Sequence, residues 1–226
     1  MVINIFNISR LRTYSDGDGI STLVGCMGCP LRCAYCLNPY SWDGSIIGEK
    51  LTVDELYDKV KIDNLYFLST GGGIVFGGGE PLLQSKFIRK FIEKYNDTGW
   101  KFGLETSLST KKENLEELID YIDFFIVDTK DMNKKRYETY TSGKYDLFID
   151  NLKFLKDNVK IDKIRLRVPE IPKLHKSNEI NENSAILKDM GFENIENFRY
   201  IKPEIIKPLS EVMIKRIKEF NELLID

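Results

Sequence analysis

The stretch GCMGCPLRCAYCLNP, residues 25–39, holds all four cysteines of a 226-residue chain. Their spacing is Cys26-x2-Cys29-x3-Cys33-x2-Cys36. Zinc knuckles usually separate two CxxC pairs by a longer loop, so a four-cysteine zinc site fits this spacing poorly. A four-cysteine iron–sulfur cluster also has short spacings. The sharper interpretation is the CxxxCxxC triplet of Cys29, Cys33 and Cys36, because three thiolates on a [4Fe–4S] cube leave one iron open to a small molecule.

The overall composition excludes several classes of protein. The chain is 42% hydrophobic and 30% charged, with a formal net charge of −2, so no basic field points to nucleic acid. No run approaches the roughly 18 apolar residues of a membrane span, and the N-terminus lacks the apolar core of a signal peptide. We therefore expect a cytoplasmic protein without membrane or nucleic-acid partners. In that compartment, clustered cysteines are metal ligands or catalytic groups rather than disulfides.

On both sides of the cysteine loop along the chain, short apolar runs alternate with amphipathic segments. This alternation predicts an α/β fold with a parallel sheet and outer helices. About six strand–helix units, fewer than the eight of a closed barrel, indicate a partial (βα)6 barrel, which we expect to form a single domain over residues 1–226. The expected strands are 2–9, 20–25, 72–78, 101–107, 123–130, 163–172 and 195–203, and the expected helices are 51–61, 82–95, 110–122, 145–157, 183–191 and 209–224.

Two helix starts carry the capping-box pattern, Thr52 with Glu55 and Thr110 with Glu113. The unusual residues fall at the ends of expected strands, and carboxyl ends of parallel strands meet at one edge of a sheet. We therefore expect one site built from these loops. Its members are the cysteine loop, the GGGEP segment at 77–81, Glu105 with Thr106, Asp128 with Lys130, and Arg167.

Several segments in order carry a family resemblance. They are DGDGI (16–20), GCPLRCAYCLNP (28–39) with SWDG (41–44), LTVDEL (51–56), GGGIVFGGGEPLLQ (71–84), LETS (104–107), VDTKDMN (127–133) and RLRVPEIP (165–172). With these segments the sequence resembles the radical S-adenosylmethionine (SAM) superfamily. More closely, it is similar to the glycyl-radical-enzyme activating proteins, typified by pyruvate formate-lyase activating enzyme.

The resemblance implies a function and its cofactors. Cys29, Cys33 and Cys36 would bind a [4Fe–4S] cluster, and the amino and carboxylate groups of SAM would chelate the fourth iron. An electron from the cluster would break the sulfonium C–S bond. The resulting 5′-deoxyadenosyl radical would remove a Cα hydrogen from a glycine of a partner glycyl radical enzyme. A flavodoxin or ferredoxin-type reductant would supply the electron.

Further site residues follow from the same resemblance. Tyr35 would lie near the adenine, with simple packing over the cluster as the alternative. Gly78, Gly79 and Glu80 look like the site for the SAM ammonium group, since glycines allow close backbone approach and carbonyls or a carboxylate accept from an ammonium. Cys26 is either a small apolar filler beside the loop or an accessory group.

The ends of the later strands add oxygen ligands and cationic groups. Glu105, Thr106 and Asp128 match positions that help to bind a monovalent cation near the SAM carboxylate, with capping or solvated carboxylates as the alternative. Lys130 would contact SAM or the partner, or lie on the surface. Arg167 would hold the SAM carboxylate or ribose, or form an interior salt bridge.

Some positions depart from the family pattern. Asp18 replaces the usual proline and Ser21 the usual arginine, Gly77 stands where serine is common, and Glu105 replaces aspartate. The single histidine, His175, lies too early to match the family's late histidine motif. These departures keep a second hypothesis open, a radical SAM enzyme acting on a small molecule or short peptide. A non-catalytic iron–sulfur or zinc interaction protein is a third.

Overall fold

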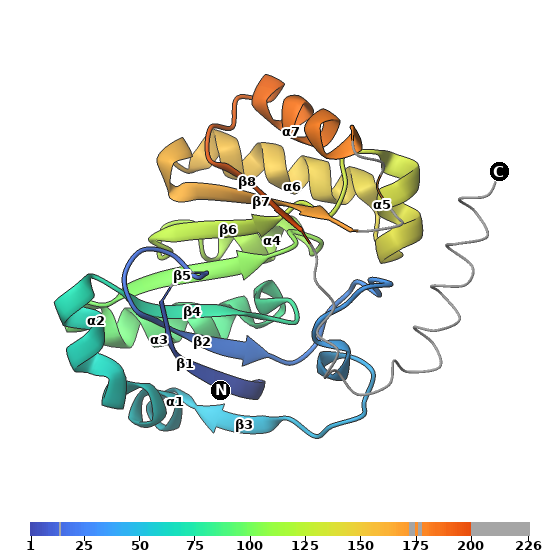
Figure 1. The fold of residues 1–226 in the computed structure, drawn as a ribbon. Helices are drawn as coiled ribbons and strands as arrows, with labels where there is room; N and C mark the ends of the chain where they lie inside the picture. Colours follow the sequence, from blue (N-terminus) through green and yellow to red (C-terminus); the bar gives the residue numbers. More distant parts are fainter. Residues whose placement is uncertain (14, 172–174, 176–177, 200–226) are drawn as a thin grey trace.

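A computed structural model of the chain describes residues 1–13, 15–171, 175 and 178–199. They form one eight-stranded sheet in the order β3-β1-β2-β4-β5-β6-β7-β8 (Figure 1). All neighbours from β2 to β8 pair in parallel, whereas β1 pairs antiparallel with β2 and β3. The strands are β1 (Val2–Arg12), β2 (Ser21–Cys26), β3 (Glu49–Thr52), β4 (Gly73–Gly78), β5 (Lys101–Thr106), β6 (Phe124–Asp128), β7 (Ile164–Glu170) and β8 (Ile195–Arg199).

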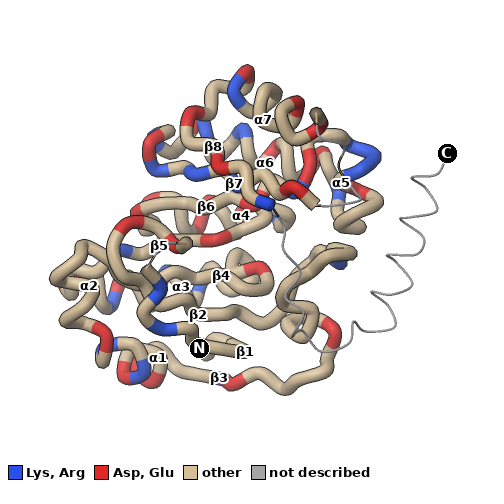
Figure 2. Tube along the Cα trace, viewed as in Figure 1, with Lys and Arg blue, Asp and Glu red and all other residues tan. Residues whose placement is uncertain are grey.

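Helices connect the parallel strands, as the alternation predicts. The α-helices are α1 (Val53–Val60), α2 (Asn64–Thr70), α3 (Ser85–Tyr95), α4 (Lys112–Glu116), α5 (Lys134–Thr141), α6 (Tyr145–Asn158) and α7 (Glu179–Asp189). Short 3-10 helices are η1 (Pro39–Ser41), η2 (Lys61–Asp63), η3 (Pro81–Gln84), η4 (Asn96–Thr98) and η5 (Ile161–Lys163). The α/β partial-barrel prediction is thus confirmed, while the helix predicted at 209–224 lies outside the described residues. Figure 2 shows Lys and Arg interspersed with Asp and Glu along these elements.

The length and apolar character of a helix decide whether it could span a membrane. Across residues 1–199, apart from the gaps at 14, 172–174 and 176–177, no helix is long and apolar enough to cross a bilayer.

The two faces of the sheet differ in character because successive side chains in a strand point to opposite faces. One set joins the main hydrophobic core under the helices: Phe102 and Leu104 of β5, Phe125 and Val127 of β6, and Leu166 and Val168 of β7. The alternate set on the same strands carries the charged side chains Glu105, Asp128, Arg165 and Arg167, together with Gly103 and the apolar Phe124 and Ile126 of β6. Burial of the first set fixes the register, so the second set must face the open side of the sheet.

The β1–β2 loop folds over that open side and crosses the middle strands (Figure 1). Gly17 has a φ of +94°, and a Cβ there would lie 2.4 Å from the Phe124 ring. A glycine is needed at this position because an L-residue would be strained in the left-handed region and would collide with that ring. Arg167 also donates a side-chain hydrogen bond to the backbone oxygen of Ser15. The loop is therefore anchored to β6 and β7, across the open face.

The cysteine loop follows β2, the strand expected at 20–25. Two local predictions need correction. Arg167 lies within β7, not at its end. The capping box at Thr110 is wrong: α4 begins at Lys112 without a side-chain cap. Asn151 donates to the Thr110 oxygen at 2.8 Å, which fixes this segment in a non-helical conformation. Helices α2 and α5 were not expected from the sequence.

The capping box at Thr52 is confirmed and gives a stability prediction. The Thr52 hydroxyl accepts from the Glu55 N–H, and the Glu55 carboxylate accepts from the Thr52 N–H at 2.7 Å. Thr52→Ala should lower the free energy of unfolding by about 1 kcal/mol, because one helix N–H loses its acceptor. Urea denaturation of the apo chain measures this. Thr52→Ser keeps the hydroxyl and should stay close to the unmodified chain; equal losses in both variants would contradict the assignment.

Candidate active site

The cysteine loop is held by backbone hydrogen bonds that it donates to the last turn of α5. The Arg32 N–H donates to the Thr141 oxygen at 2.7 Å, and the Ala34 N–H to the Tyr140 oxygen at 2.9 Å. These contacts satisfy carbonyl groups that a helix end otherwise leaves unpaired. Leu31 packs close to Gly143, where a Cβ would lie 2.4 Å from the leucine. The conformation of the loop between Cys29 and Cys36 therefore depends on α5.

The turn after β4 holds the loop from the other side. The Gly79 N–H donates to the Cys26 oxygen at 3.0 Å, and the Glu80 N–H to the Gly28 oxygen at 2.8 Å. A Cβ on Gly79 would lie 2.3 Å from the Gly28 oxygen, and Gly78 has a φ of +93°. Gly79 is thus required for close backbone packing of the turn against the cysteine loop, and Gly78 for the left-handed backbone of the turn and its packing on Phe6. Their predicted close approach to SAM stays a prediction, and both glycines line the cavity described below.

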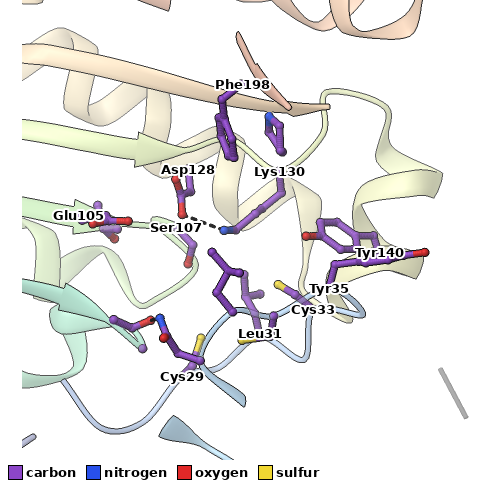
Figure 3. Close-up of a pocket in the computed structure, with 17 residues that line it drawn as sticks. Cys29, Leu31, Cys33, Tyr35, Glu105, Ser107, Asp128, Lys130, Tyr140 and Phe198 are labelled. Atoms are coloured by element: carbon purple, nitrogen blue, oxygen red, sulfur yellow. Dashed lines mark hydrogen bonds and ion pairs between the residues drawn. The ribbon is translucent and has the colours of Figure 1, made fainter. Parts of the chain in front are cut away.

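Three cysteines and the predicted strand ends line one cavity (Figure 3). In Figure 3, Cys29 and Cys33 approach it from the loop, while Asp128 and Lys130 approach it from the strand side. Leu31, Leu37, Tyr140, Pro169 and Phe198 form its apolar wall. The complete lining is Cys29, Leu31, Cys33, Tyr35, Cys36, Leu37, Asn38, Gly78, Gly79, Glu105, Thr106, Ser107, Asp128, Lys130, Tyr140, Pro169 and Phe198.

Two ion pairs neutralise the carboxylates at this edge of the sheet. Lys130 Nζ lies 2.9 Å from Asp128 Oδ2, and Arg167 Nη1 lies 3.0 Å from Glu105 Oε1. Burial, and then the neighbouring Asp128, raise the pKa of Glu105 to about 7. Lys130 has a φ of +57°, a left-handed conformation that costs a non-glycine residue on the order of 1 kcal/mol. The fold therefore tolerates local strain where it places this ammonium beside the cavity.

A comparison with protein-family models supplies the family. The model described as "Radical SAM superfamily" matches residues 23–167. That range contains the cysteine loop, the turn after β4, and the strand ends with Glu105, Asp128 and Arg167.

The chain belongs to the radical SAM superfamily.

Two activating enzymes are similar to this chain over most of its length. A pyruvate formate-lyase-activating enzyme of Clostridium pasteurianum is 33% identical over 187 residues, which cover 82% of this chain and 77% of that protein. A (2S)-3-sulfopropanediol dehydratase activating enzyme of Klebsiella oxytoca is 27% identical over 83% of this chain and 78% of its own length.

Solved structures support the fold. Streptococcus suis SuiB bound to SAM matches 88% of this chain with a TM-score of 0.60 and 16% identity, and this chain spans 45% of SuiB. A domain of a pyruvate-formate lyase-activating enzyme from Bacteroides vulgatus matches 68% of this chain and 94% of its own, with a TM-score of 0.50 and 20% identity. These neighbours share the fold of the eight-stranded sheet.

As a radical SAM oxidoreductase, the protein works with a [4Fe–4S] cluster and SAM. The thiols of Cys29, Cys33 and Cys36 fit this cluster, because all three line one cavity and pack on one small apolar group. Within the described part of the chain, no three Cys, His, Asp or Glu side chains gather as ligands of a single metal ion. A cube binds each cysteine to a different iron, so its ligands need not converge on one point.

Cys26 lies apart from this group. It is fully buried in the main hydrophobic core, and its Sγ lies 3.7 Å from the Val24 oxygen. Burial, followed by the nearby Glu80 charge, raises the pKa of the Cys26 thiol. These surroundings agree with the filler interpretation of this cysteine.

The structure brings seven of the nine expected SAM-site residues to the cavity wall: Tyr35, Gly78, Gly79, Glu105, Thr106, Asp128 and Lys130. Glu80 and Arg167 are not among the lining residues. The Glu80 carboxylate is fully buried and accepts from Thr106 Oγ1 at 2.6 Å and from Ser107 N and Oγ at 2.9 and 2.6 Å. Its oxygens therefore join β4 to β5. Arg167 forms an interior salt bridge with Glu105, as in the alternative interpretation of this residue.

The monovalent cation stays a prediction. The oxygens expected to bind it have partners within the protein: Lys130 for Asp128, Arg167 for Glu105, and Glu80 for the Thr106 hydroxyl. As arranged, these residues do not form an open cation site, so we assign no role to such a cation.

Sequence reasoning missed several residues of the cavity. Ser107 directly follows the predicted ligands Glu105 and Thr106. It lies two residues after Glu105, so strand alternation could have placed both side chains on the same face. Tyr140 comes from α5, whose start is marked by Asn133, which accepts from the Arg136 N–H at 3.1 Å. Phe198 comes from β8, a short strand far along the chain. No local pattern predicts that it lines the same cavity as the cysteine loop.

Two departures from the family pattern touch each other. A Cβ on Gly77 would lie 3.0 Å from both the Glu105 Cβ and Leu23 Cδ1, and 3.3 Å from Glu105 Oε2. The family commonly has serine and aspartate at these positions, so a smaller residue on β4 stands beside a larger one on β5. Gly77 makes room for the longer carboxylate that pairs with Arg167.

This contact predicts energetic coupling between the two sites. Gly77→Ser should lower the free energy of unfolding by about 1–2 kcal/mol, because the added atoms overpack against Glu105. In the Glu105→Asp background the same change should cost less, because the contact with Glu105 Oε2 is removed, while the contacts with the Cβ of residue 105 and with Leu23 remain. Urea denaturation of the four proteins in a double-mutant cycle measures the coupling. An identical cost of Gly77→Ser in both backgrounds would show that the two departures are independent.

Proposed function

We propose that this protein activates a glycyl radical enzyme. The observation that carries the proposal is the match to curated activating enzymes along about four fifths of the chain. In the proposal, residues 1–226 act as a single radical SAM domain. A flavodoxin or ferredoxin-type protein serves as reductant, and a glycine in a large partner enzyme is the substrate.

Cys29, Cys33 and Cys36 are the proposed cluster ligands. Burial, and then the Glu80 charge, raises the pKa of the Cys29 thiol, so a bound metal is needed to displace its proton at neutral pH. When bound, the cluster and SAM supply the electron transfer and the 5′-deoxyadenosyl radical that removes a Cα hydrogen from the partner's glycine. The backbone hydrogen bonds that the cysteine loop donates to α5 and accepts from the turn after β4 orient the three thiols.

The charges of the cavity suit SAM. Glu105 and Asp128 favour the sulfonium and ammonium groups, and Lys130 favours the carboxylate. Tyr35, half-buried on the loop, offers an aromatic surface for the adenine. Gly78 and Gly79 contribute backbone to the same wall. Glu80, Thr106 and Arg167 act through their neighbours: Glu80 and Thr106 fix the strand ends, and Arg167 holds Glu105.

The rim of the cavity suits a macromolecular partner. Leu37 and Phe198 line the cavity, yet their exposed fractions are 47% and 38%. Exposed apolar side chains beside a polar interior are typical of a surface that another chain covers. A protein loop that carries the target glycine would bury both residues as it enters.

A second candidate is a radical SAM enzyme acting on a small molecule or short peptide, favoured by the departures at Asp18 and Ser21. Ser21 is buried at the amino end of β2, and its hydroxyl has no hydrogen-bond partner among the described residues. Asp18 has a fully exposed carboxylate 3.6 Å from Arg165. Neither residue lines the cavity beside the cysteines, so these departures give the second candidate only weak support.

The ligand assignment predicts the outcome of cysteine substitutions. The reconstituted protein should bind about four irons per chain. Cys29→Ala, Cys33→Ala and Cys36→Ala should each abolish reductive SAM cleavage and lower cluster content. Cys26→Ala is the matched control and should keep the cluster, because Cys26 lies in the hydrophobic core. Iron analysis and 5′-deoxyadenosine quantification measure both effects. Loss of the cluster in Cys26→Ala with retention in Cys29→Ala would overturn the assignment.

The activase function predicts a radical on the partner. The reduced protein with SAM and a glycyl radical enzyme should give one 5′-deoxyadenosine per radical. The radical should show a doublet EPR signal that collapses when the target glycine carries deuterium at Cα. A candidate partner is an enzyme encoded by a neighbouring reading frame. If that partner stays EPR-silent while a small molecule or peptide drives stoichiometric 5′-deoxyadenosine formation, the second candidate replaces the first.

A further inference from the structure

A tryptophan that the proposed site leaves unused contacts a proposed cluster ligand. The indole Nε1–H of Trp42 donates a hydrogen bond to Cys36 Sγ, with the nitrogen 3.5 Å from the sulfur. Trp42 follows η1, where its backbone N–H donates to the Pro39 oxygen at 3.1 Å. The ring is therefore carried by a short helical turn just after the cysteine loop.

Arg32 holds the face of this ring. Its guanidinium carbon lies 4.6 Å from the centroid of the Trp42 ring, within the range of a cation–π contact. The same guanidinium donates from Nη1 to the backbone oxygens of Cys29 and Leu31 at 2.6 and 2.8 Å. Arg32 is thus fixed to the loop between two cysteines and fixes the indole in turn. The N–H of Trp42 points at the Cys36 sulfur because η1 fixes the Trp42 backbone and Arg32 fixes the ring.

We propose that Trp42 is a positioning residue that raises the reduction potential of the cluster through its hydrogen bond to Cys36. The inference rests on the proposed function, in which Cys36 is a cluster ligand. Reduction adds one electron and no proton to the cluster and its thiolates. A donor aimed at a ligand sulfur stabilises the added negative charge, and hydrogen bonds to sulfur are among the factors that set cluster potentials. The Arg32 charge acts in the same direction.

The chain offers a matched control. Its other tryptophan, Trp100, also uses its indole N–H, which donates to Asn64 Oδ1 at 2.7 Å, and it packs in the main core. Trp42→Phe and Trp100→Phe make the same chemical change, the loss of one indole N–H. Only the first removes a donor to a proposed ligand, and phenylalanine keeps an aromatic face for Arg32.

The test is a redox titration of the reconstituted proteins, with dithionite as the electron source and EPR of the reduced cluster as the readout. Trp42→Phe should keep its iron content and shift the midpoint potential to a more negative value. Trp100→Phe should leave the midpoint unchanged. A loaded Trp42→Phe protein with the same midpoint as the unmodified protein would overturn the inference. Failure of the unmodified protein to bind a cluster would instead contradict the proposed function.

A second measurement needs no variant. In the unmodified protein with ¹⁵N-labelled indole nitrogens, pulsed EPR of the reduced cluster should detect a coupled tryptophan nitrogen. An exchangeable proton signal should also disappear in D2O. Absence of the nitrogen coupling in a fully loaded protein would overturn the inference, even if Trp42→Phe fails to fold.

Discussion

The site depends on the hydrogen bonds that the buried carboxylate of Glu80 accepts. The carboxylate accepts hydrogen bonds from the end of β5 through Thr106 and Ser107 and from the Leu82 N–H at 3.2 Å. Burial raises its pKa, and these donors oppose that change. A carboxylate without them would be very costly to bury. The Glu80 N–H meanwhile holds the Gly28 oxygen of the cysteine loop, so one residue sets the positions of β4, β5 and the loop.

A second constraint is the alternation of side chains along the central strands. The apolar set must face the helices to bury its surface, which leaves Glu105, Asp128 and Arg167 on the other face. The cavity collects charge because the hydrophobic core occupies the opposite side. The Arg167–Glu105 and Lys130–Asp128 pairs then balance that charge. Gly77 adapts the packing to the longer Glu105 side chain. The resulting cavity suits a ligand with both cationic and anionic groups.

Most of this architecture could be predicted from local patterns. Strand–helix alternation gave the parallel sheet, and the CxxxCxxC triplet with the glycine turn gave the site, because each signal lies within a few consecutive residues. Helix α5 was missed since its segment KKRYETYT is mostly polar, and its importance lies in long-range contacts with the cysteine loop. Glu80 was predicted at SAM but faces Ser107, and Trp42 reaches Cys36 only through the fold of η1. Such pairings depend on tertiary packing, which spacing along one chain does not encode.

In the proposed function, three cysteines hold a [4Fe–4S] cluster and leave one iron for SAM. The most direct test is electron–nuclear double resonance on the reduced protein with SAM carrying ¹⁵N in its amino group and ¹⁷O in its carboxylate. We expect hyperfine coupling of both labels to the cluster, because both groups would bind the same iron. A fully loaded cluster that shows neither coupling while SAM is bound would contradict it.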